Sequence, residues 1–296
     1  MQRPRPKRAP SSRAGRVRVD GRPLPKPRLD RSSPAKVEIV SIGRELLRGQ
    51  VPDGNAPRLA EQLTRLGAVV QRITVVDDGR RAVASALTEA LARGSRFVVL
   101  SGGLGPGADD RTLEAISEAL SRPLADHPGA RRLVESAYRR LRQDGLVSLQ
   151  GMNAAREKMC VVPVGGDAIA NPIGPAPGML IRLPGGVAVL ALPGVPEEAQ
   201  AVLQEALPLL RDVITAVFTA QREVETPTKD ESALRPLLDR VTEEFAGVVV
   251  KSHLPGFERD TGVVVTLEAT GSSRREAEST VESALRRLLE LAGVGQ

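Results

Sequence analysis

Residues 98–112 read VVLSGGLGPGADDRT, and this stretch decides how the rest of the chain folds. The apolar run at its start is typical of a strand that a parallel sheet buries on both faces. Four glycines among the next seven residues predict a turn with few side chains, where backbone N–H groups can approach a phosphate closely. Asp109 and Asp110 follow where we expect a helix to begin, and they can cap that helix, hold a divalent cation, or do both.

The segment before this stretch alternates strands with helices. Apolar runs predict strands, and helical spacing of apolar residues predicts two helices, which Asp53 and Asp78 cap and which Gly67 and Gly94 end. The predicted strands are residues 37–42, 68–76 and 96–101, and the predicted helices are residues 53–66 and 78–93. Alternation over short connections is typical of an α/β fold with a doubly wound, mostly parallel sheet. Such a sheet binds ligands at the carboxyl ends of its strands, where the loop that begins at Gly43 and the glycine-rich turn both lie.

The part of the chain after the glycine-rich turn is dense in Pro and Gly. We expect helices at residues 109–120, 128–143, 151–158 and 195–210, and short strands at residues 160–163, 179–183 and 187–193. Two loops, residues 171–178 and 192–198, combine Pro, which fixes φ, with Gly, which frees it. Loops of this composition are stiff, yet they let a ligand come close to the backbone.

From about residue 211 the pattern changes to strand, helix, strand, strand, helix, which predicts a small α+β domain over residues 211–296. Thr228 and Glu231 have the spacing of a capping box at the start of its first helix. The expected strands are residues 213–226, 248–252 and 262–269, and the expected helices are residues 228–245 and 272–291. Residues 36–210 make up the larger domain.

Residues 1–35 differ from the rest of the chain in charge and periodicity. They carry eleven Lys and Arg against two Asp, so the overall net charge of +6 leaves −3 for the remainder. Rich in Pro and Arg and without hydrophobic periodicity, they predict a disordered tail. The tail is either an arm that contacts a polyanion or an extension without a role.

Composition excludes several classes of protein. Aromatic residues make up 2% of the chain, too few for the stacking platforms that bind single-stranded nucleic acid. The single cysteine, Cys160, excludes an internal disulfide and a cysteine-based zinc site. No apolar run approaches the roughly 20 residues that span a bilayer. We therefore expect a cytoplasmic protein with no membrane partner.

Two further polar side chains near the predicted carboxyl edge each have two interpretations. Glu45 is either an ordinary solvated carboxylate or a second acid that faces the same cleft as Asp109 and Asp110. Asn55 is either a residue of a first helical turn or a ligand contact. The two histidines of the chain stand in poor contexts for a metal site or for a Ser–His–Asp triad.

Four motifs stand in the order and spacing of one known family. SIGRELLRGQVPDGN, SGGLGPGADDRT, NPIGPAPGM and LPGVPEEA resemble motifs of the CinA (competence/damage-inducible protein A) family, and MNAAREKM and KSHLPG resemble its archaeal branch. The resemblance implies the MoCF domain of MoaB- and MogA-like molybdopterin-binding proteins, followed by a KH-like α+β domain. It also implies hydrolysis of a nucleotide pyrophosphate such as ADP-ribose with a divalent cation, namely Mg²⁺, Mn²⁺ or Co²⁺. The sequence has no counterpart of the nicotinamide mononucleotide deamidase domain of larger members, so we expect no deamidase activity.

The resemblance assigns roles to individual residues. It implies that Asp109, Asp110 and Glu45 are catalytic and that the two Asp residues hold the metal. It further implies that ligand contacts come from all four motifs, namely from Gly43, Gly102, Gly103, Gly105, Asn171, Gly174, Pro177, Gly178, Pro193, Gly194 and Pro196. From the residues themselves we add Arg44 and Asn55 as candidate ligand contacts.

Three positions depart from the family pattern. Arg44 stands where the family has Thr, and it can either pair with a phosphate or occlude the pocket. Gly107 replaces a Thr whose hydroxyl could contact phosphate or metal, which weakens the case for catalysis more than the case for binding. Ala199 replaces a Met.

Two functions therefore stay open. One is hydrolysis, and the other is binding of a nucleotide or of molybdopterin without hydrolysis. We expect a homo-oligomer. Nucleic acid is disfavoured as a partner because no GxxG loop lies between the helices of the predicted α+β domain.

Overall fold

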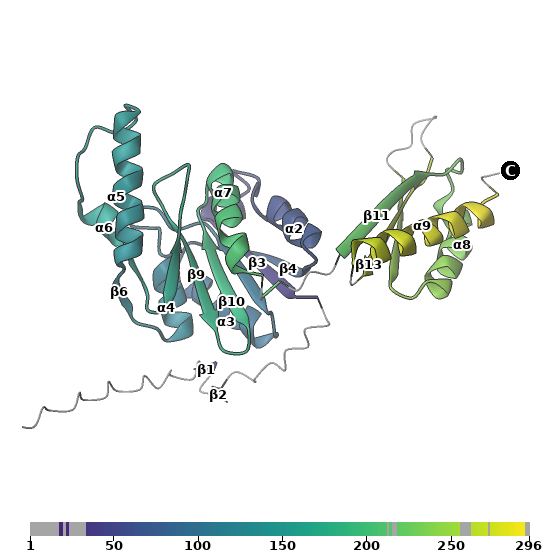
Figure 1. Cartoon of the computed structure of the whole chain (residues 1–296), viewed down its shortest axis with the longest axis horizontal. Helices are drawn as coiled ribbons and strands as arrows, with labels where there is room; N and C mark the ends of the chain where they lie inside the picture. Colours follow the sequence, from purple (N-terminus) through teal and green to yellow (C-terminus); the bar gives the residue numbers. More distant parts are fainter. Residues whose placement is uncertain are drawn as a thin grey trace, which may run out of the picture.

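The computed structural model describes residues 18–19, 22–23, 34–211, 213–214, 218–254, 262–271 and 273–293. Its larger unit is built on a six-stranded sheet of order β4-β3-β5-β10-β9-β8 (Figure 1). The parallel strands are β4 (Val69–Val76), β3 (Lys36–Ile42), β5 (Phe97–Ser101) and β10 (Val187–Leu192). The strands β9 (Gly178–Leu183) and β8 (Gly166–Ile169) each pair antiparallel with the preceding neighbour in that order. The predicted mostly parallel sheet is confirmed, whereas β8 was not predicted.

The sheet is covered on both faces, which makes it doubly wound. In β3, Val40 and Ile42 belong to one core, and Val37 and Ile39 belong to the other. The first core is covered by α3 (Arg80–Ala92), α4 (Thr112–Leu120) and α5 (Pro128–Gln143), and the second by α2 (Ala56–Arg65) and α7 (Pro196–Ala206). Alternate side chains of one strand therefore enter two cores, which is why the central strands read as continuous apolar runs.

Several predicted helix starts are wrong. The helix expected from residue 109 begins at Thr112. Asp53 and Asp78 are not N-caps, because the residues at those positions are Asn55 and Gly79. The carboxylate of Asp53 accepts the N–H groups of Asn55 at 2.9 Å and of Ala56, the first residue of α2, at 3.0 Å, whereas the carboxylate of Asp78 pairs with Arg44. A tertiary partner therefore takes Asp78 away from local capping, while Asp53 still binds the start of α2 from two positions before the N-cap.

The structure adds short elements that were not predicted and changes the bounds of others. The loop after β3 contains α1 (Arg44–Leu47), and α6 (Ala154–Lys158) is shorter than predicted. The strands β6 (Leu124–Asp126) and β7 (Val161–Pro163) pair antiparallel as a two-stranded ribbon. The helix predicted to run to residue 210 ends as α7 at Ala206 and continues as the 3₁₀ turn η1 (Leu207–Leu209).

The C-terminal unit has the predicted order of strand, helix, strand, strand, helix. Its elements are β11 (Phe218–Glu225), α8 (Glu231–Glu244), β12 (Val248–His253), β13 (Val264–Gly271) and α9 (Arg274–Leu291). The strands form an antiparallel sheet of order β11-β13-β12, and both helices contribute to its core. The predicted capping box is wrong, because the carboxylate of Asp230 caps α8 by accepting N–H groups of Ser232 at 3.0 Å and Ala233. Val213, predicted to begin β11, belongs to the core of the larger unit.

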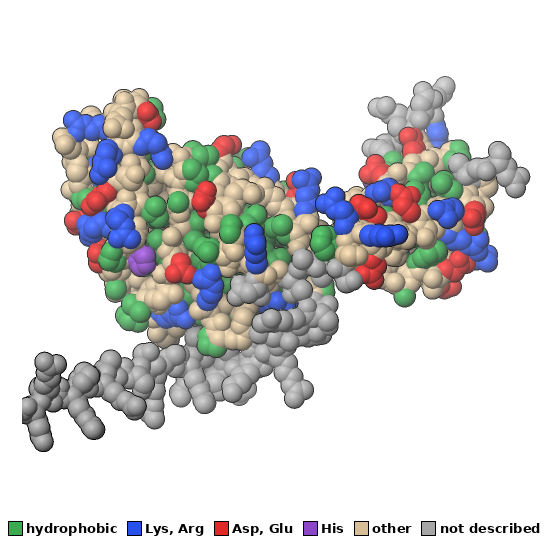
Figure 2. Space-filling view, in the orientation of Figure 1, with side chains coloured by type: hydrophobic (Ala, Val, Ile, Leu, Met, Phe, Trp, Pro, Cys, Tyr) green, Lys and Arg blue, Asp and Glu red, His purple; other side chains and the backbone are tan. Residues whose placement is uncertain are grey.

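The predicted tail lies mostly outside the described residues. Within it, β1 (Arg18–Val19) and β2 (Arg22–Pro23) pair antiparallel, and Ala35 is fully buried in the second core. On the face that Figure 2 shows, Lys and Arg side chains are interspersed with Asp and Glu. Within the described ranges, no helix is long and apolar enough to cross a bilayer.

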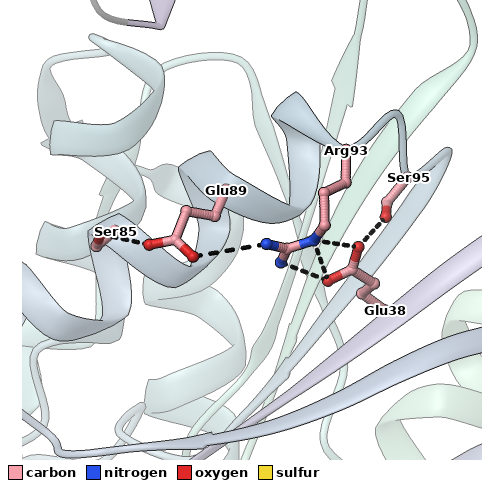
Figure 3. Close-up of polar contacts among 5 residues, drawn as sticks. All are labelled: Glu38, Ser85, Glu89, Arg93 and Ser95. Atoms are coloured by element: carbon pink, nitrogen blue, oxygen red, sulfur yellow. Dashed lines mark hydrogen bonds and ion pairs between the residues drawn. The ribbon is translucent and has the colours of Figure 1, made fainter.

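One charged cluster has a structural place in the larger unit. Glu38 in β3 is 2% exposed, and Arg93 at the end of α3 donates to its carboxylate through Nε at 3.0 Å and Nη2 at 2.7 Å (Figure 3). Ser95 Oγ donates to the same carboxylate at 2.7 Å, and Glu89 pairs with the other side of Arg93. The buried charge is therefore both paired and hydrogen-bonded, which a buried carboxylate requires.

Candidate functional site

Loops from four parallel strands meet at one edge of the larger sheet. Because β3, β4, β5 and β10 run in the same direction, their carboxyl ends and the loops that follow lie together (Figure 1). These loops contain α1 after β3, the acidic residues 77–78 after β4, the glycine-rich turn after β5, and residues 193–195 after β10. The first and second sequence motifs therefore share this edge, as predicted, and the fourth motif lies there too.

The glycine-rich turn begins in a narrow space between β3 and β10. The N–H group of Gly102 donates to Leu192 O at 2.9 Å, and Gly102 has a φ of 115°. A Cβ at this position would lie 2.5 Å from the carbonyl oxygen of Ile42, a backbone atom that cannot rotate away. A Cβ on Gly194 would lie 3.5 Å from the Cα of Gly102. Two of the predicted ligand-contact glycines are thus adjacent, and the first must be Gly for backbone reasons alone.

Thr112 closes the turn, a role that the sequence did not reveal. Its hydroxyl donates to Gly102 O at 2.7 Å, and its N–H group donates to Gly103 O at 3.1 Å. Gly103 has a φ of 67°, and a Cβ there would overlap Thr112 Oγ1. The first residue of α4 is therefore tied to the two residues that follow β5, and the residues between them form the turn.

Most amides of this turn have no acceptor. Within the described part of the chain, no hydrogen bond is donated by the N–H groups of Gly103, Leu104, Gly105, Ala108, Asp109 and Arg111. Successive free N–H groups in a turn form a concavity that favours an anion. The turn therefore has N–H groups free to bind an anion, and its role as a phosphate loop stays a prediction.

Asp109 and Asp110 converge beside Gly107. A Cβ on Gly107 would lie 2.5 Å from Asp109 Oδ1 and 2.8 Å from Asp110 Oδ2, so both carboxylates approach the same side of this glycine. Asp110 Oδ2 accepts the N–H group of Gly107 at 2.8 Å. Neither residue caps α4, because the N-cap is Arg111, which makes no capping bond through its side chain. The capping interpretation of the pair is therefore wrong.

Arg44 is held by the two acids that follow β4. Its Nε donates to Asp77 Oδ2 at 3.0 Å, and its Nη2 donates to Asp77 Oδ1 at 3.0 Å and to Asp78 Oδ1 at 2.9 Å. These hydrogen bonds hold the pKa of Asp77 well below its ordinary value, whereas burial and the neighbouring Asp77 raise the pKa of Asp78. Arg44 is half-exposed and its guanidinium is engaged by carboxylates. It is therefore not a free phosphate ligand in this state.

Glu45 lies on α1, next to Arg44. Its side chain is exposed, and its carboxylate folds back over Gly43, where a Cβ would overlap it. The N–H group of Gly43 donates to Val76 O at 3.1 Å, which ties the start of α1 to the end of β4. No hydrogen bond in the described residues joins Glu45 to Asp109 or Asp110.

A network of hydrogen bonds between polar side chains links the ends of three strands. Ser41 at the end of β3 donates to Asp53, and Asp53 accepts the N–H group of Asn55 at 2.9 Å. The amide of Asn55 donates to Ser101 Oγ at 2.8 Å and to Gly194 O at 2.7 Å. Asn55 is 8% exposed, and its Oδ1 has no partner in the described residues. Sequence reasoning placed Asn55 at this edge but missed that its amide links the loops after β5 and β10.

The third motif is organised by Asn171. Its Nδ2 donates to Ala176 O at 2.8 Å and to Glu198 Oε2 at 2.6 Å, and its Oδ1 accepts the N–H groups of Ile173 and Gly174. Its amide thus has one donor bond inside the loop and one to α7, and its oxygen accepts two N–H groups of the loop. A Cβ on Gly174 would overlap the carboxylate of Glu198. The loop is thus fastened to the first turn of α7.

The remaining predicted ligand contacts are packed within the protein. Pro177 and Gly178 are buried, and a Cβ on Gly178 would overlap Val202. Pro193 is buried and its carbonyl accepts from Ser101 Oγ at 3.3 Å, while Pro196 opens α7. A small hollow of about 130 Å³ lies between α5 and this region, lined by Leu133, Ser136, Ala137, Arg140, Ala170, Asn171, Pro172, Gly174, Pro175 and Pro177. The third motif thus borders a hollow separate from the glycine-rich turn.

A divalent cation at this edge would rely on few protein ligands. Among the described residues, no group of three or more His, Cys, Asp or Glu side chains is arranged to hold a metal ion. Asp109 and Asp110 approach the same side of Gly107, and the carboxylate of Asp109 accepts no hydrogen bond from a described residue. One or two carboxylates together with substrate phosphates are a common set of ligands for Mg²⁺.

Comparison with known proteins places this geometry in a family. Residues 38–212 match the family described as a probable molybdopterin binding domain. A protein from Caldivirga maquilingensis is 38% identical over 256 residues, which cover 86% of this chain and 95% of that protein. A protein from Thermococcus kodakarensis is 36% identical over 248 residues, which cover 83% of this chain and 94% of that protein. The crystal structure of the protein CinA from Thermoplasma acidophilum, described as of unknown function, has a TM-score of 0.53 and 32% identity, covering 60% of this chain and 99% of its own.

Proposed function

Because the chain belongs to the molybdopterin-binding domain family, as a CinA-like member, we propose that it binds a nucleotide pyrophosphate at its glycine-rich turn and hydrolyses it. The observation that carries the proposal is the set of free backbone N–H groups in residues 103–111, beside two carboxylates at the carboxyl edge of a parallel sheet. Free amides favour phosphate oxygens, and carboxylates do not bind phosphate unless a cation lies between them. The combination thus suits a phosphate that arrives with a divalent metal.

Asp109 and Asp110 have the chemistry to hold that metal. Their carboxylates converge beside Gly107, and only Asp110 has an internal hydrogen bond. When bound, Mg²⁺, Mn²⁺ or Co²⁺ would neutralise phosphate charge and polarise a phosphorus–oxygen bond. The turn amides would then hold the substrate oxygens and keep the reacting phosphorus in place.

The proposed reaction adds water across the pyrophosphate. A water oxygen bonds to one phosphorus, the bond from that phosphorus to the bridging oxygen breaks, and ADP-ribose gives AMP and ribose 5-phosphate with release of a proton. Glu45 is the candidate acceptor of that proton, because its carboxylate is exposed beside Gly43 and free of described hydrogen bonds. Glu45→Gln removes the acceptor while keeping the shape of the side chain, so it should lower turnover without weakening binding.

A second candidate function is binding without hydrolysis, and Gly107 favours it. Glycine supplies no hydroxyl to a metal or phosphate at a position where the resembling family has Thr. The ligand would then be a nucleotide or molybdopterin. Under this alternative the turn amides still bind phosphate, and ligand binding raises the melting temperature without product formation.

A single set of assays separates these functions. The full chain is incubated with ADP-ribose or FAD and with Mg²⁺, Mn²⁺ or Co²⁺, and products are quantified by chromatography. We expect turnover that is lost in the double variant Asp109→Ala and Asp110→Ala and kept in Asp239→Ala, an exposed acid of the C-terminal unit. Turnover that survives the double substitution would reject the site. Absence of turnover with every metal would reject hydrolysis, and thermal shifts with the same ligands then test binding.

A further inference from the structure

Lys158, at the end of α6, is hydrogen-bonded to the backbone of the glycine-rich turn. Its Nζ donates to Gly105 O at 3.2 Å and also to the carbonyl oxygens of Gly107 and Asp110. The side chain is half-buried, and α6 belongs to a segment about 50 residues after the turn. A single ammonium group therefore binds three carbonyls of the turn, of which only Gly107 O also accepts an N–H group of the turn, that of Asp110 at 3.3 Å.

The three contacts use the whole donor capacity of Lys158. An ammonium group has three N–H donors and no acceptor, and each donor has a carbonyl partner here. No donor is left for a substrate. Lys158 can therefore influence ligand binding only through the turn.

The direction of these carbonyls fixes the direction of the amides. In a trans peptide the C=O and the following N–H point in opposite directions, and the structure has no cis peptide bond among its described residues. With the carbonyls of Gly107 and Asp110 turned toward Lys158, the N–H groups of Ala108 and Arg111 point away from it. Neither amide has an acceptor in the described residues.

The positive charge of Lys158 also favours binding of an anion at the turn. Asp109 and Asp110 stand in the same turn and repel an approaching phosphate. A cation behind the turn offsets part of this repulsion without blocking the face that the amides present. Burial of its ammonium lowers the pKa of Lys158, and the negative charge of Asp110 raises it.

We propose that Lys158 is a positioning residue, which holds the glycine-rich turn in its anion-accepting shape without touching the ligand. The proposal rests on the proposed function only where it concerns phosphate binding. Its structural part, that the closed turn depends on Lys158, stands on the three hydrogen bonds alone.

The test compares Lys158→Met with the wild-type chain and with Lys251→Met. Met keeps the apolar stem and removes the ammonium, and Lys251 is an exposed lysine of β12 with no described ion pair. Binding of inorganic pyrophosphate with Mg²⁺ is measured by calorimetry. We expect Lys158→Met to weaken binding at least tenfold and Lys251→Met to leave it within twofold. Wild-type affinity in Lys158→Met would overturn the proposal.

Amide hydrogen exchange supplies a readout that a general loss of stability would not imitate. The N–H groups of Asp110 and Thr112 are bonded inside the turn, to Gly107 O and Gly103 O. In Lys158→Met we expect both to exchange at least tenfold faster, while amides of β5 keep their wild-type rates. Equal slowing or quickening throughout β5 and the turn would contradict a positioning role.

The two measurements separate the possible failures. If the wild-type chain binds neither pyrophosphate nor ADP-ribose, the proposed function fails, and exchange in the unliganded turn still decides the role of Lys158. If Lys158→Met does not fold, Lys158→Arg replaces it, because a planar guanidinium cannot place three N–H groups around one atom. We expect the Arg variant to lose at least threefold in pyrophosphate affinity, and an unchanged affinity would reject the proposal.

Discussion

Gly102→Ala should strongly destabilise the larger unit, because the new methyl group has no room to move. A non-glycine residue at a φ of 115° carries backbone strain of about 1–3 kcal/mol. The Cβ would also lie 2.5 Å from the Ile42 carbonyl oxygen in β3, and overpacking of this kind costs about 1–3 kcal/mol. Together these terms predict a loss of roughly 4 kcal/mol in the free energy of unfolding.

Gly105→Ala is the matched control in the same turn. Its Cβ would lie 2.7 Å from Asp110 Oδ2, which is the end of a side chain that can rotate. No positive φ is imposed at this position, so we expect a loss below about 1 kcal/mol. The displaced carboxylate should nevertheless weaken binding of Mn²⁺, measured by calorimetry.

Urea unfolding can be followed in the larger unit alone. The chain has no Trp, and its one Tyr, Tyr138, lies on α5, so tyrosine fluorescence reports on this unit and not on the C-terminal one. The midpoint of Gly102→Ala should fall far below that of Gly105→Ala, with the same dependence on urea concentration. Equal midpoints for the two variants would refute the steric argument at β3.

Four further substitutions test the polar clusters. Arg93→Met leaves the buried Glu38 unpaired and should cost about 2–3 kcal/mol by urea unfolding, the low end for a broken buried pair because Arg93 is one-third exposed. Burial raises the pKa of Glu38, but hydrogen bonds from Arg93 and Ser95 hold it below its ordinary value of 4.5. The contribution of the ionised Glu38 to the free energy of unfolding is therefore complete above pH 4.5 and is lost as the pH falls through the lowered pKa. Glu38→Gln should therefore flatten stability against pH below about 4.5, and an unchanged slope would count against the pair. Arg44→Thr should raise the pKa of Asp77 toward its ordinary value in a carboxyl NMR titration, whereas a pKa that stays low would show that Arg44 is not its cause. Asn55→Asp turns a donor to Gly194 O into an acceptor and should cost roughly 2–4 kcal/mol by the same urea assay; wild-type stability would contradict the observed orientation of the amide.

The parallel core could be predicted because its signal is local. Three apolar runs, each followed by a helix, define β3, β4 and β5 and their shared direction, and glycines follow the first two of these helices. The short strand β8, GDAI, has no such run and is a strand only because β9 pairs with it. Its existence depends on a tertiary partner, which single-sequence patterns do not contain.

In the candidate site, too, features with a local sequence signal could be predicted, and features that depend on distant residues could not. The sequence placed the glycine-rich turn and Asn55 at one sheet edge, because both follow strands. It assigned Asp53 and Asp78 to helix caps, since a carboxylate before a helix usually caps it. In the structure Asp53 accepts from Ser41 and Asp78 pairs with Arg44. Lys158 could not be found at all, because nothing local in AREKM indicates a contact with residues about 50 positions earlier.

The long sequence separations around the glycine-rich turn bear on synthesis of the protein. Asn55 reaches Gly194 across 139 residues, and Gly102 meets Leu192, so the edge is complete only after residue 194 has joined the sheet. Contacts this distant form late, because the entropy of closing a long loop must be overcome first. A chain that is still being synthesised, or that is cut before residue 194, therefore lacks the contacts that complete this edge. Under the proposed function, the stoichiometry of phosphate binding measures the fraction of fully folded molecules in a preparation.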